Sequence, residues 1–143
     1  MGYRAGMLIV TTIEIPGYRV DAVIGQVMGI TARTVDLGTG LSAGLRALSG
    51  GEVSELTQLL YDSRNQAVDR MWQQCVERGG NAIVRMRFDT SQSPSEVCAY
   101  GTAVVVSPIA TAEEGGTLQS IGQARFAATS SAANKETVEQ PTS

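Results

Sequence analysis

The sequence predicts an α+β domain in which one long helix packs on a small antiparallel β-sheet. Apolar residues recur at helical spacing over residues 49–80, and two segments of alternating polarity follow at 81–89 and 96–107. Two β-rich segments precede the helix and are separated from it by a glycine-rich stretch. The expected order is therefore strand, strand, short helix, long helix, strand, strand.

The composition limits the compartment and the kinds of partner. The chain has 143 residues, a usual size for one domain, and 43% of them are hydrophobic. Its net charge of −3 argues against nucleic acid, whose phosphates require clustered Lys and Arg. No apolar run is long enough to cross a membrane, and two cysteines are too few for a disulfide framework. We therefore expect a cytoplasmic protein that binds neither nucleic acid nor membrane.

The two ends of the chain differ from its middle. We expect residues 1–6 to be a leader or an alternative start, residues 7–108 to fold, and residues 109–143 to form a tail. The tail is rich in Ala, Thr, Ser, Gln and Glu, and it cannot bury enough apolar surface to offset the entropy of ordering. A low-complexity, disordered tail is the prediction. The alternative is a short helix that docks on an unknown partner, formed around Leu118, Ile121, Arg125 and Phe126.

Two N-terminal strands are predicted from β-rich composition. Leu8–Ile15 is stopped by the turn signal Pro16-Gly17, and a longer strand is expected over Tyr18–Arg33. Gly25 and Gly29 fall opposite the apolar row of this second strand, where a missing side chain permits either a bulge or the close approach of another backbone. That row is expected to contain Val20, Ala22, Ile24, Met28 and Ile30.

The long helix has signals at both ends. Ser49 and Glu52 have the spacing of a capping box, and Gly79-Gly80 supplies a residue able to take the left-handed conformation that ends helices. The preceding stretch, 36–51, contains a short helical patch over 41–48 and no glycine pattern for phosphate binding. The side chains expected to face the sheet are Val53, Leu56, Leu60, Ala67, Val68, Met71, Cys75 and Val76.

The last two strands are expected to form a hairpin that is symmetric about its central turn. The expected helix-facing pairs are Val84–Gly101, Met86–Ala99 and Phe88–Val97. On the second face, Arg85 would neighbour Tyr100 and Arg87 would neighbour Cys98. The second face also carries apolar side chains, which suits a subunit interface, and a covering layer formed by residues 8–33 is the alternative.

Several short motifs, in this order along the chain, resemble the YbjQ-like family. They are VIGQVMG over 23–29, the pair Gly50-Gly51, SRNQA over 63–67, GNAIV over 80–84 and GTAV over 101–104. The similarity covers residues 8–107. The resemblance implies an α+β domain described as "putative heavy-metal-binding", in a largely uncharacterised family. It also implies that subunits close into a ring, a homopentamer.

A metal-binding role would depend on the two cysteines, because the chain has no histidine. Cys75 lies on the apolar stripe of the helix, where a free cysteine is most often a small core residue. Cys98 lies on the second hairpin face, and a ring could gather it from several subunits. Arg87 beside it would lower the pKa of its thiol. Cys98 is therefore the candidate ligand for a heavy-metal ion, and the alternative is a structural or incidental cysteine.

Catalysis is not expected from this sequence. Without histidine there is no Ser–His or Cys–His pair, and the carboxylates are scattered along the chain. The candidate interface or ligand face is formed by Arg85, Arg87 and Tyr100. Our first hypothesis is a homo-oligomeric, ring-forming binding or structural module with an unidentified ligand or partner. The alternative is a thiol-dependent heavy-metal-binding protein that uses Cys98 gathered across subunits.

Overall fold

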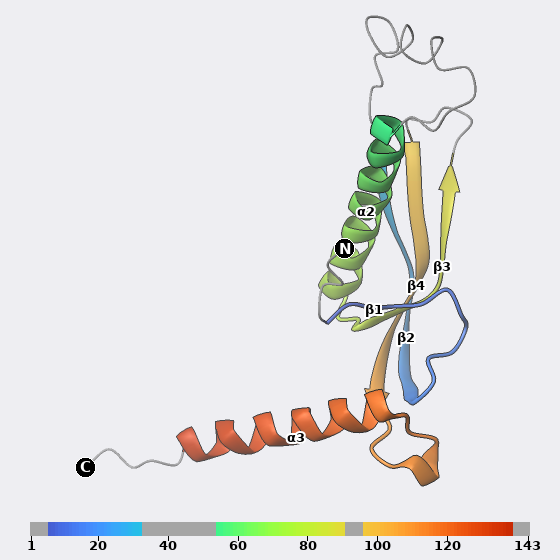
Figure 1. Ribbon diagram of the computed structural model, residues 1–143. Coiled ribbons are helices and arrows are strands. Elements are labelled where there is room, and N and C mark those ends of the chain that lie inside the picture. The colour runs from blue at the N-terminus through green and yellow to red at the C-terminus, as the bar shows by residue number, and fades with distance from the viewer. Residues whose placement is uncertain (1–5, 33–53, 91–95, 139–143) are drawn as a thin grey trace, which may run out of the picture.

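The computed structural model describes residues 6–32, 54–90 and 96–138, and the surroundings of side chains at 6–32, 57–90 and 96–133. Four strands form one sheet in the order β1-β3-β4-β2, and α2 lies along one face of it (Figure 1). The last helix, α3, extends away from the body of the domain (Figure 1). The elements are β1 Leu8–Ile9, β2 Tyr18–Ala32, α2 Ser54–Glu77, β3 Ala82–Thr90, β4 Glu96–Pro108, the 3-10 helix η1 Ala112–Glu114 and α3 Leu118–Val138.

The predicted α+β class is confirmed, but the sheet is mixed rather than antiparallel. β2 and β3 both pair with β4 in antiparallel fashion, whereas β1 pairs with β3 in parallel. The reason is that the chain bends after Ile9 and turns at Pro16-Gly17, which carries β2 to the opposite edge of the sheet. The first strand therefore ends at Ile9 and not at Ile15.

Several predicted features lie outside the described residues. These are residues 1–5 of the expected leader, the stretch 36–51 with its helical patch over 41–48, the capping-box residues Ser49 and Glu52, the pair Gly50-Gly51, Val53, and the side chain of Leu56.

The C-terminal end of α2 follows the predicted glycine pattern. Gly79 has a φ of 85°, and its N–H donates to the carbonyl of Val76 at 2.9 Å. The N–H of Gly80 donates to the carbonyl of Cys75 at 2.9 Å, which completes a Schellman motif. Ala67, Met71 and Cys75 are fully buried against the sheet, as predicted. Val76 is 51% exposed, contrary to expectation, because it lies 100° around the helix from Cys75.

Two bulges divide the long strand β2. One falls between Val20 and Ala22 and the other between Val23 and Gly25, where Gly25 has a φ of 129°. The second bulge reverses the alternation, so Ile24 packs toward α2 while Met28 and Ile30 face the other way. The single apolar row predicted for this strand is therefore wrong.

The outer edge of β2 is sealed by polar side chains of α2. The side-chain oxygen of Gln74 accepts a hydrogen bond from the N–H of Met28 at 2.9 Å. Arg78 donates to the carbonyl of Gln26 at 2.9 Å, and Arg70 donates to the carbonyl of Ile30. These bonds occupy backbone groups that an exposed edge strand would otherwise offer to another chain.

The β3–β4 register differs from the predicted hairpin. Phe88 lies opposite Ala99, Asp89 opposite Cys98, and Arg87 opposite Tyr100. Toward the start of β3 the pairing shifts by one residue, and Val84 lies opposite Thr102. Arg85 and Met86 together lie opposite Gly101, which makes a β-bulge. The segment after β1 causes the shift, because it takes the backbone groups that would otherwise bond to β4. The N–H of Arg85 donates to Thr12 at 2.9 Å and that of Met86 to Val10 at 3.0 Å.

The core has one cluster on each face of the sheet. The larger cluster lies under α2 and contains Val27, Ala67, Met71, Cys75, Ile83, Met86, Val97, Ala99 and Ala103. The smaller one lies on the opposite face and contains Ile15, Ala82, Val84, Val104 and Val106. Leu8, Val10 and Tyr18 pack against the smaller cluster, so Val84 belongs to a second layer and not to the helix-facing side. Residues 8–18 cover only part of this face.

The segment 109–143, predicted to be disordered, contains a helix of 21 residues over Leu118–Val138. Its start has a capping arrangement: the N–H of Ser120 donates to the hydroxyl of Thr117 at 3.2 Å, and the N–H of Thr117 donates to the hydroxyl of Ser120 at 2.8 Å. Ser120 is fully buried and donates to the carbonyl of Ile109 at 2.9 Å. Leu118 is 94% and Phe126 72% exposed, so these two side chains do not pack on the rest of the described chain, and docking of this helix on a partner stays a prediction.

Candidate functional site

One part of the sheet face opposite α2 is not covered by residues 8–18, and we call it the open face. It is built of two rows that cross three strands. In one row Met28 of β2, Tyr100 of β4 and Arg87 of β3 lie side by side. In the next row the neighbours are Ile30, Cys98 and Asp89. Met28 is 41%, Ile30 44% and Tyr100 36% exposed, so apolar side chains reach the surface between polar ones.

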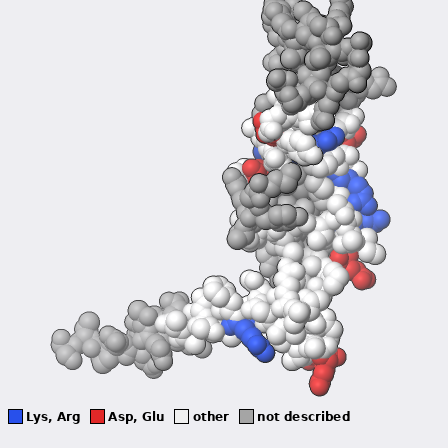
Figure 2. All heavy atoms as spheres, viewed as in Figure 1, with Lys and Arg blue, Asp and Glu red and all other residues white. Residues whose placement is uncertain are grey.

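The open face borders a hollow of about 400 Å³ that we call the arginine hollow. It is lined by Gln26, Arg85, Arg87, Tyr100, Gly101 and Thr102. The three residues predicted to form an interface or ligand face therefore line one depression, although the register that brings them there differs from the predicted one. Arginine side chains gather along the side of the molecule on which β3 lies (Figure 2).

The charges around the hollow are of one sign. Arg87 donates from Nη1 to the carbonyls of Thr11 at 2.9 Å and Met86 at 2.8 Å. Within the part of the chain that the structure describes, the guanidinium of Arg85 has no hydrogen-bond or ion-pair partner, and no carboxylate lines the hollow. The predicted pairing of Arg85 with Tyr100 and Arg87 with Cys98 is wrong: Arg87 lies opposite Tyr100, in the register that begins at Thr90 and Val97, and Arg85 lies in the bulge opposite Gly101.

Cys98 lies half-buried on the open face, between Ile30 and Asp89. Partial burial raises the pKa of its thiol, and the negative charges of Asp89 and Glu96 raise it further. The expectation that Arg87 lowers the pKa of Cys98 is therefore wrong: the neighbour across the strands is a carboxylate. A thiol held protonated is a weaker nucleophile and a weaker metal ligand.

Cys75 lies on the other side of the sheet, fully buried under α2. Its thiol donates to the carbonyl of Ala82 at 3.5 Å, and burial raises its pKa. The two thiols of one chain face opposite sides of the sheet, as the sequence pattern predicted. Among the described residues, no group of three or more Cys, Asp or Glu side chains gathers closely enough to hold a metal ion. The donors that the structure describes in a single chain do not fit a heavy-metal site.

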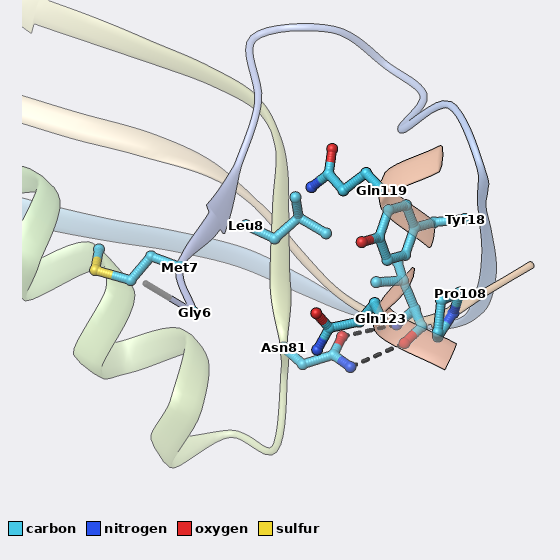
Figure 3. Close-up of a pocket in the computed structure, with 9 residues that line it drawn as sticks. Gly6, Met7, Leu8, Tyr18, Asn81, Pro108, Gln119 and Gln123 are labelled. Carbon is cyan, nitrogen blue, oxygen red and sulfur yellow. Dashed lines mark hydrogen bonds between the residues drawn. The ribbon is translucent and has the colours of Figure 1, made fainter. Parts of the chain in front are cut away.

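A second depression, of about 290 Å³, lies where β1, the start of β2, the end of β4 and α3 meet (Figure 3). Its polar lining groups are neutral: Tyr18, Asn81, Gln119 and Gln123. The Asn81 side chain is already engaged, since its amide donates to the carbonyl of Val106 at 2.9 Å and its oxygen accepts from the N–H of Val106 at 2.7 Å. No sequence signal pointed to this cleft, because it forms only when α3 and β1 are both in place.

These features define the class of protein: a small α+β domain with one helix on a four-stranded mixed sheet, a second helix beyond it, and a partly uncovered sheet face that borders two arginines. The chain belongs to the YbjQ family, whose model is described as "Putative heavy-metal-binding" and matches residues 7–107.

Relatives at high identity span most of the same region. A UPF0145 protein of Streptomyces avermitilis is 49% identical over 108 residues, which cover 73% of this chain and 89% of the relative. A UPF0145 protein of Acidothermus cellulolyticus is 51% identical, over 71% of this chain and 96% of the relative. A UPF0145 protein of Thermoplasma volcanium is 43% identical, over 76% and 92%.

A solved structure also aligns with this chain. It is a protein of unknown function from Pediococcus pentosaceus, of the DUF74 family, with a TM-score of 0.40 and 13% identity over 71% of this chain and 99% of that one. No helix within the described residues has the length and apolar character needed to span a membrane.

Proposed function

We propose that this protein is a homo-oligomeric binding module, not an enzyme, whose copies meet through the open face. The observation that carries the proposal is the pair of rows on that face. Met28 and Ile30 of β2 and Tyr100 of β4 expose apolar surface side by side, while Arg87 and Asp89 of β3 add opposite charges beside it. Apolar anchors beside charges that fix orientation are typical of subunit interfaces.

The two edges of the sheet are less suited than its open face to a contact between copies. β1 is a strand of two residues, and part of the outer edge of β2 is bonded to α2 through Gln74 and Arg78. A neighbouring chain that meets the sheet face does not need to break these bonds. The resemblance to the YbjQ family leads us to expect a ring, and a pentamer in particular.

The mass of the purified protein in native mass spectrometry and light scattering tests the proposal. We expect a closed ring of five copies of the 15.0 kDa chain. Ile30→Lys, which places a charge in the apolar part of the open face, should shift the mass to that of one chain while circular dichroism remains that of the folded protein. Val76→Lys is the matched control, since Val76 is 51% exposed on the helix side. A monomeric wild type, or a ring in Ile30→Lys, would contradict the proposal.

A second candidate function is thiol-dependent metal binding by Cys98 gathered across copies. It is supported by the position of Cys98 within the row that also holds Ile30 and Asp89, so copies meeting at this face would bring thiols together. One chain supplies too few ligands, so this function requires the oligomer. The cytoplasm, where thiols stay reduced, is the compartment that we propose for it.

Titration of the oligomer with Zn²⁺ and with Cu(I) tests this candidate. Wild type and Cys75→Ala should bind metal alike, because Cys75 is buried on the helix side. Cys98→Ser should lose binding. Negligible binding by wild type, or equal binding by wild type and Cys98→Ser, eliminates the candidate.

A further inference from the structure

We propose that the arginine hollow is a binding site for a phosphate-type oxyanion, either free or as the phosphoryl group of a small molecule. The inference rests on the proposed function, because it assigns a ligand class to the face through which we expect copies to meet. It is carried by three observations that are independent of any metal: the lining of the hollow, the free guanidinium of Arg85, and the backbone conformation at that residue.

The lining consists of hydrogen-bond donors arranged around one space. Arg85, Arg87 and the hydroxyls of Tyr100 and Thr102 can all donate, and Gln26 adds a side-chain amide. The volume of about 400 Å³ falls within the range of sites that hold small molecules. The chain as a whole carries a net charge of −3, so a hollow with two cations and no lining carboxylate is a local exception.

The two arginines differ in how far they are already engaged. One guanidinium nitrogen of Arg87 is fixed by the carbonyls of Thr11 and Met86, which orients the group and leaves its other N–H groups without partners in the described structure. Arg85 is held by none. Guanidinium groups recognise phosphate oxygens through paired N–H donors, so one anchored and one free arginine form a clamp for such an anion.

The β-bulge between Val84 and Arg87 of β3 places Arg85 at the hollow. Arg85 has a φ of 54°, and it is the one residue other than glycine with a positive φ among those described. That conformation costs on the order of 1 kcal/mol or more in a residue with a side chain. It is maintained by the hydrogen bonds from the N–H groups of Arg85 and Met86 to Thr12 and Val10. A glycine would relieve the strain, so the presence of arginine indicates that the side chain has a use at this position.

The strain makes a sharp test possible. Arg85→Gly removes the guanidinium and relieves the backbone, so its melting temperature should equal or exceed that of wild type while binding of inorganic phosphate weakens by about tenfold or more. Arg85→Gln should lose binding to a similar degree. Arg125→Gln is the charge-matched control, because Arg125 is exposed on α3, which extends away from the sheet (Figure 1). Calorimetric titration at constant ionic strength measures all four proteins.

Each outcome decides the proposal. Loss of phosphate binding in both Arg85 variants, with binding kept in Arg125→Gln, supports it. Equal binding in wild type and Arg85→Gly, or equal weakening in Arg125→Gln, overturns it, as does tighter binding of citrate than of phosphate. Phosphate binding by a wild type that proves monomeric supports the site although the ring proposal has failed, so the two failures are distinguishable by mass measured on the same samples.

Discussion

Gly29 on β2 and Met71 on α2 meet backbone to backbone. A β-carbon added at Gly29 would stand 2.5 Å from the backbone nitrogen of Met71 and would overlap the carbonyl oxygen of Ala67. Backbone atoms cannot swing aside as the end of a side chain can, so any larger residue must push the helix away from the sheet. The backbones of α2 and β2 can therefore lie this close only because residue 29 carries a hydrogen atom in place of a β-carbon.

We expect Gly29→Ala to destabilise the fold by about 3 kcal/mol, in the upper part of the range for overpacked cores. The midpoint of urea unfolding measures it. Gly122→Ala is the control, since a β-carbon there meets nothing within 4 Å on an exposed part of α3, and alanine is the better helix former. Equal stability of Gly29→Ala and wild type would show that the helix is free to shift.

The seal on the outer edge of β2 predicts a local effect on amide exchange. Gln74→Ala removes the acceptor for the N–H of Met28, so hydrogen exchange at Met28 should become faster. The loss of global stability should be about 1 kcal/mol. Gln73→Ala, an exposed neighbour on the same helix, should leave exchange at Met28 unchanged. Unchanged exchange in Gln74→Ala as well would mean that the bond does not protect this edge.

Asn81 acts as a side-chain extension of the sheet. Its amide group bonds both the N–H and the carbonyl of Val106 (Figure 3), so Asn81→Ala should cost about 2 kcal/mol. Asn81→Asp should be destabilising as well, because the carboxylate has no donor for the carbonyl of Val106. Thermal unfolding of both variants checks this, with Asn65→Ala on the exposed side of α2 as the control. If Asn81→Asp were as stable as wild type, the hydrogen bond to the carbonyl of Val106 would make no contribution to stability.

The environment of Cys98 predicts the pH dependence of its alkylation. Burial and the charges of Asp89 and Glu96 raise the pKa of the thiol, so its reaction with iodoacetamide should increase only at a pH above that of an ordinary cysteine. Asp89→Asn removes one of the negative charges and should move the profile to lower pH. The rates are measured in a Cys75→Ala background across neutral to alkaline pH. A profile in Asp89→Asn identical to that of the parent would exclude this electrostatic cause.

The raised pKa of the Cys98 thiol also predicts how the stability of the fold changes with pH. A raised folded-state pKa favours the neutral thiol, so this contribution to stability is fully present below the pKa of the unfolded thiol and is lost as pH rises through the folded value. Stability measured at high pH should therefore fall less steeply in Cys98→Ser than in wild type. A fall of the same steepness in both proteins would mean that Cys98 does not contribute.

The parts of the fold that local patterns determine were predictable from sequence. The buried side of α2 follows from the helical spacing of apolar residues such as Ala67 and Met71. The end of the helix follows from Gly79, which can take the left-handed conformation. Gly25 and Gly29 were predicted to mark either a bulge or a close approach, and the structure has one of each. Family membership was likewise evident from short motifs in order.

What could not be predicted depends on contacts between distant segments. The bulge in β3 accompanies hydrogen bonds from the N–H groups of Arg85 and Met86 to Thr12 and Val10, more than 70 residues earlier in the chain. The start of α3 uses Ser120 where a capping box usually has Glu or Gln, so the pattern did not signal a helix. The arginine hollow could not be predicted either, because it requires both the bulge at Arg85 and the pairing of Arg87 with Tyr100.

The order of strands has a consequence for synthesis on the ribosome. Among the described strands, β4 is the one that pairs with β2 and the antiparallel partner of β3, yet it is the last of the four to be made. The 15 residues of β2 therefore leave the ribosome long before Glu96–Pro108 exist to receive them. During that interval the nascent chain carries an unpaired strand, the state in which chaperones bind and misassembly begins. Translation beyond Pro108 is the event that allows this sheet to close.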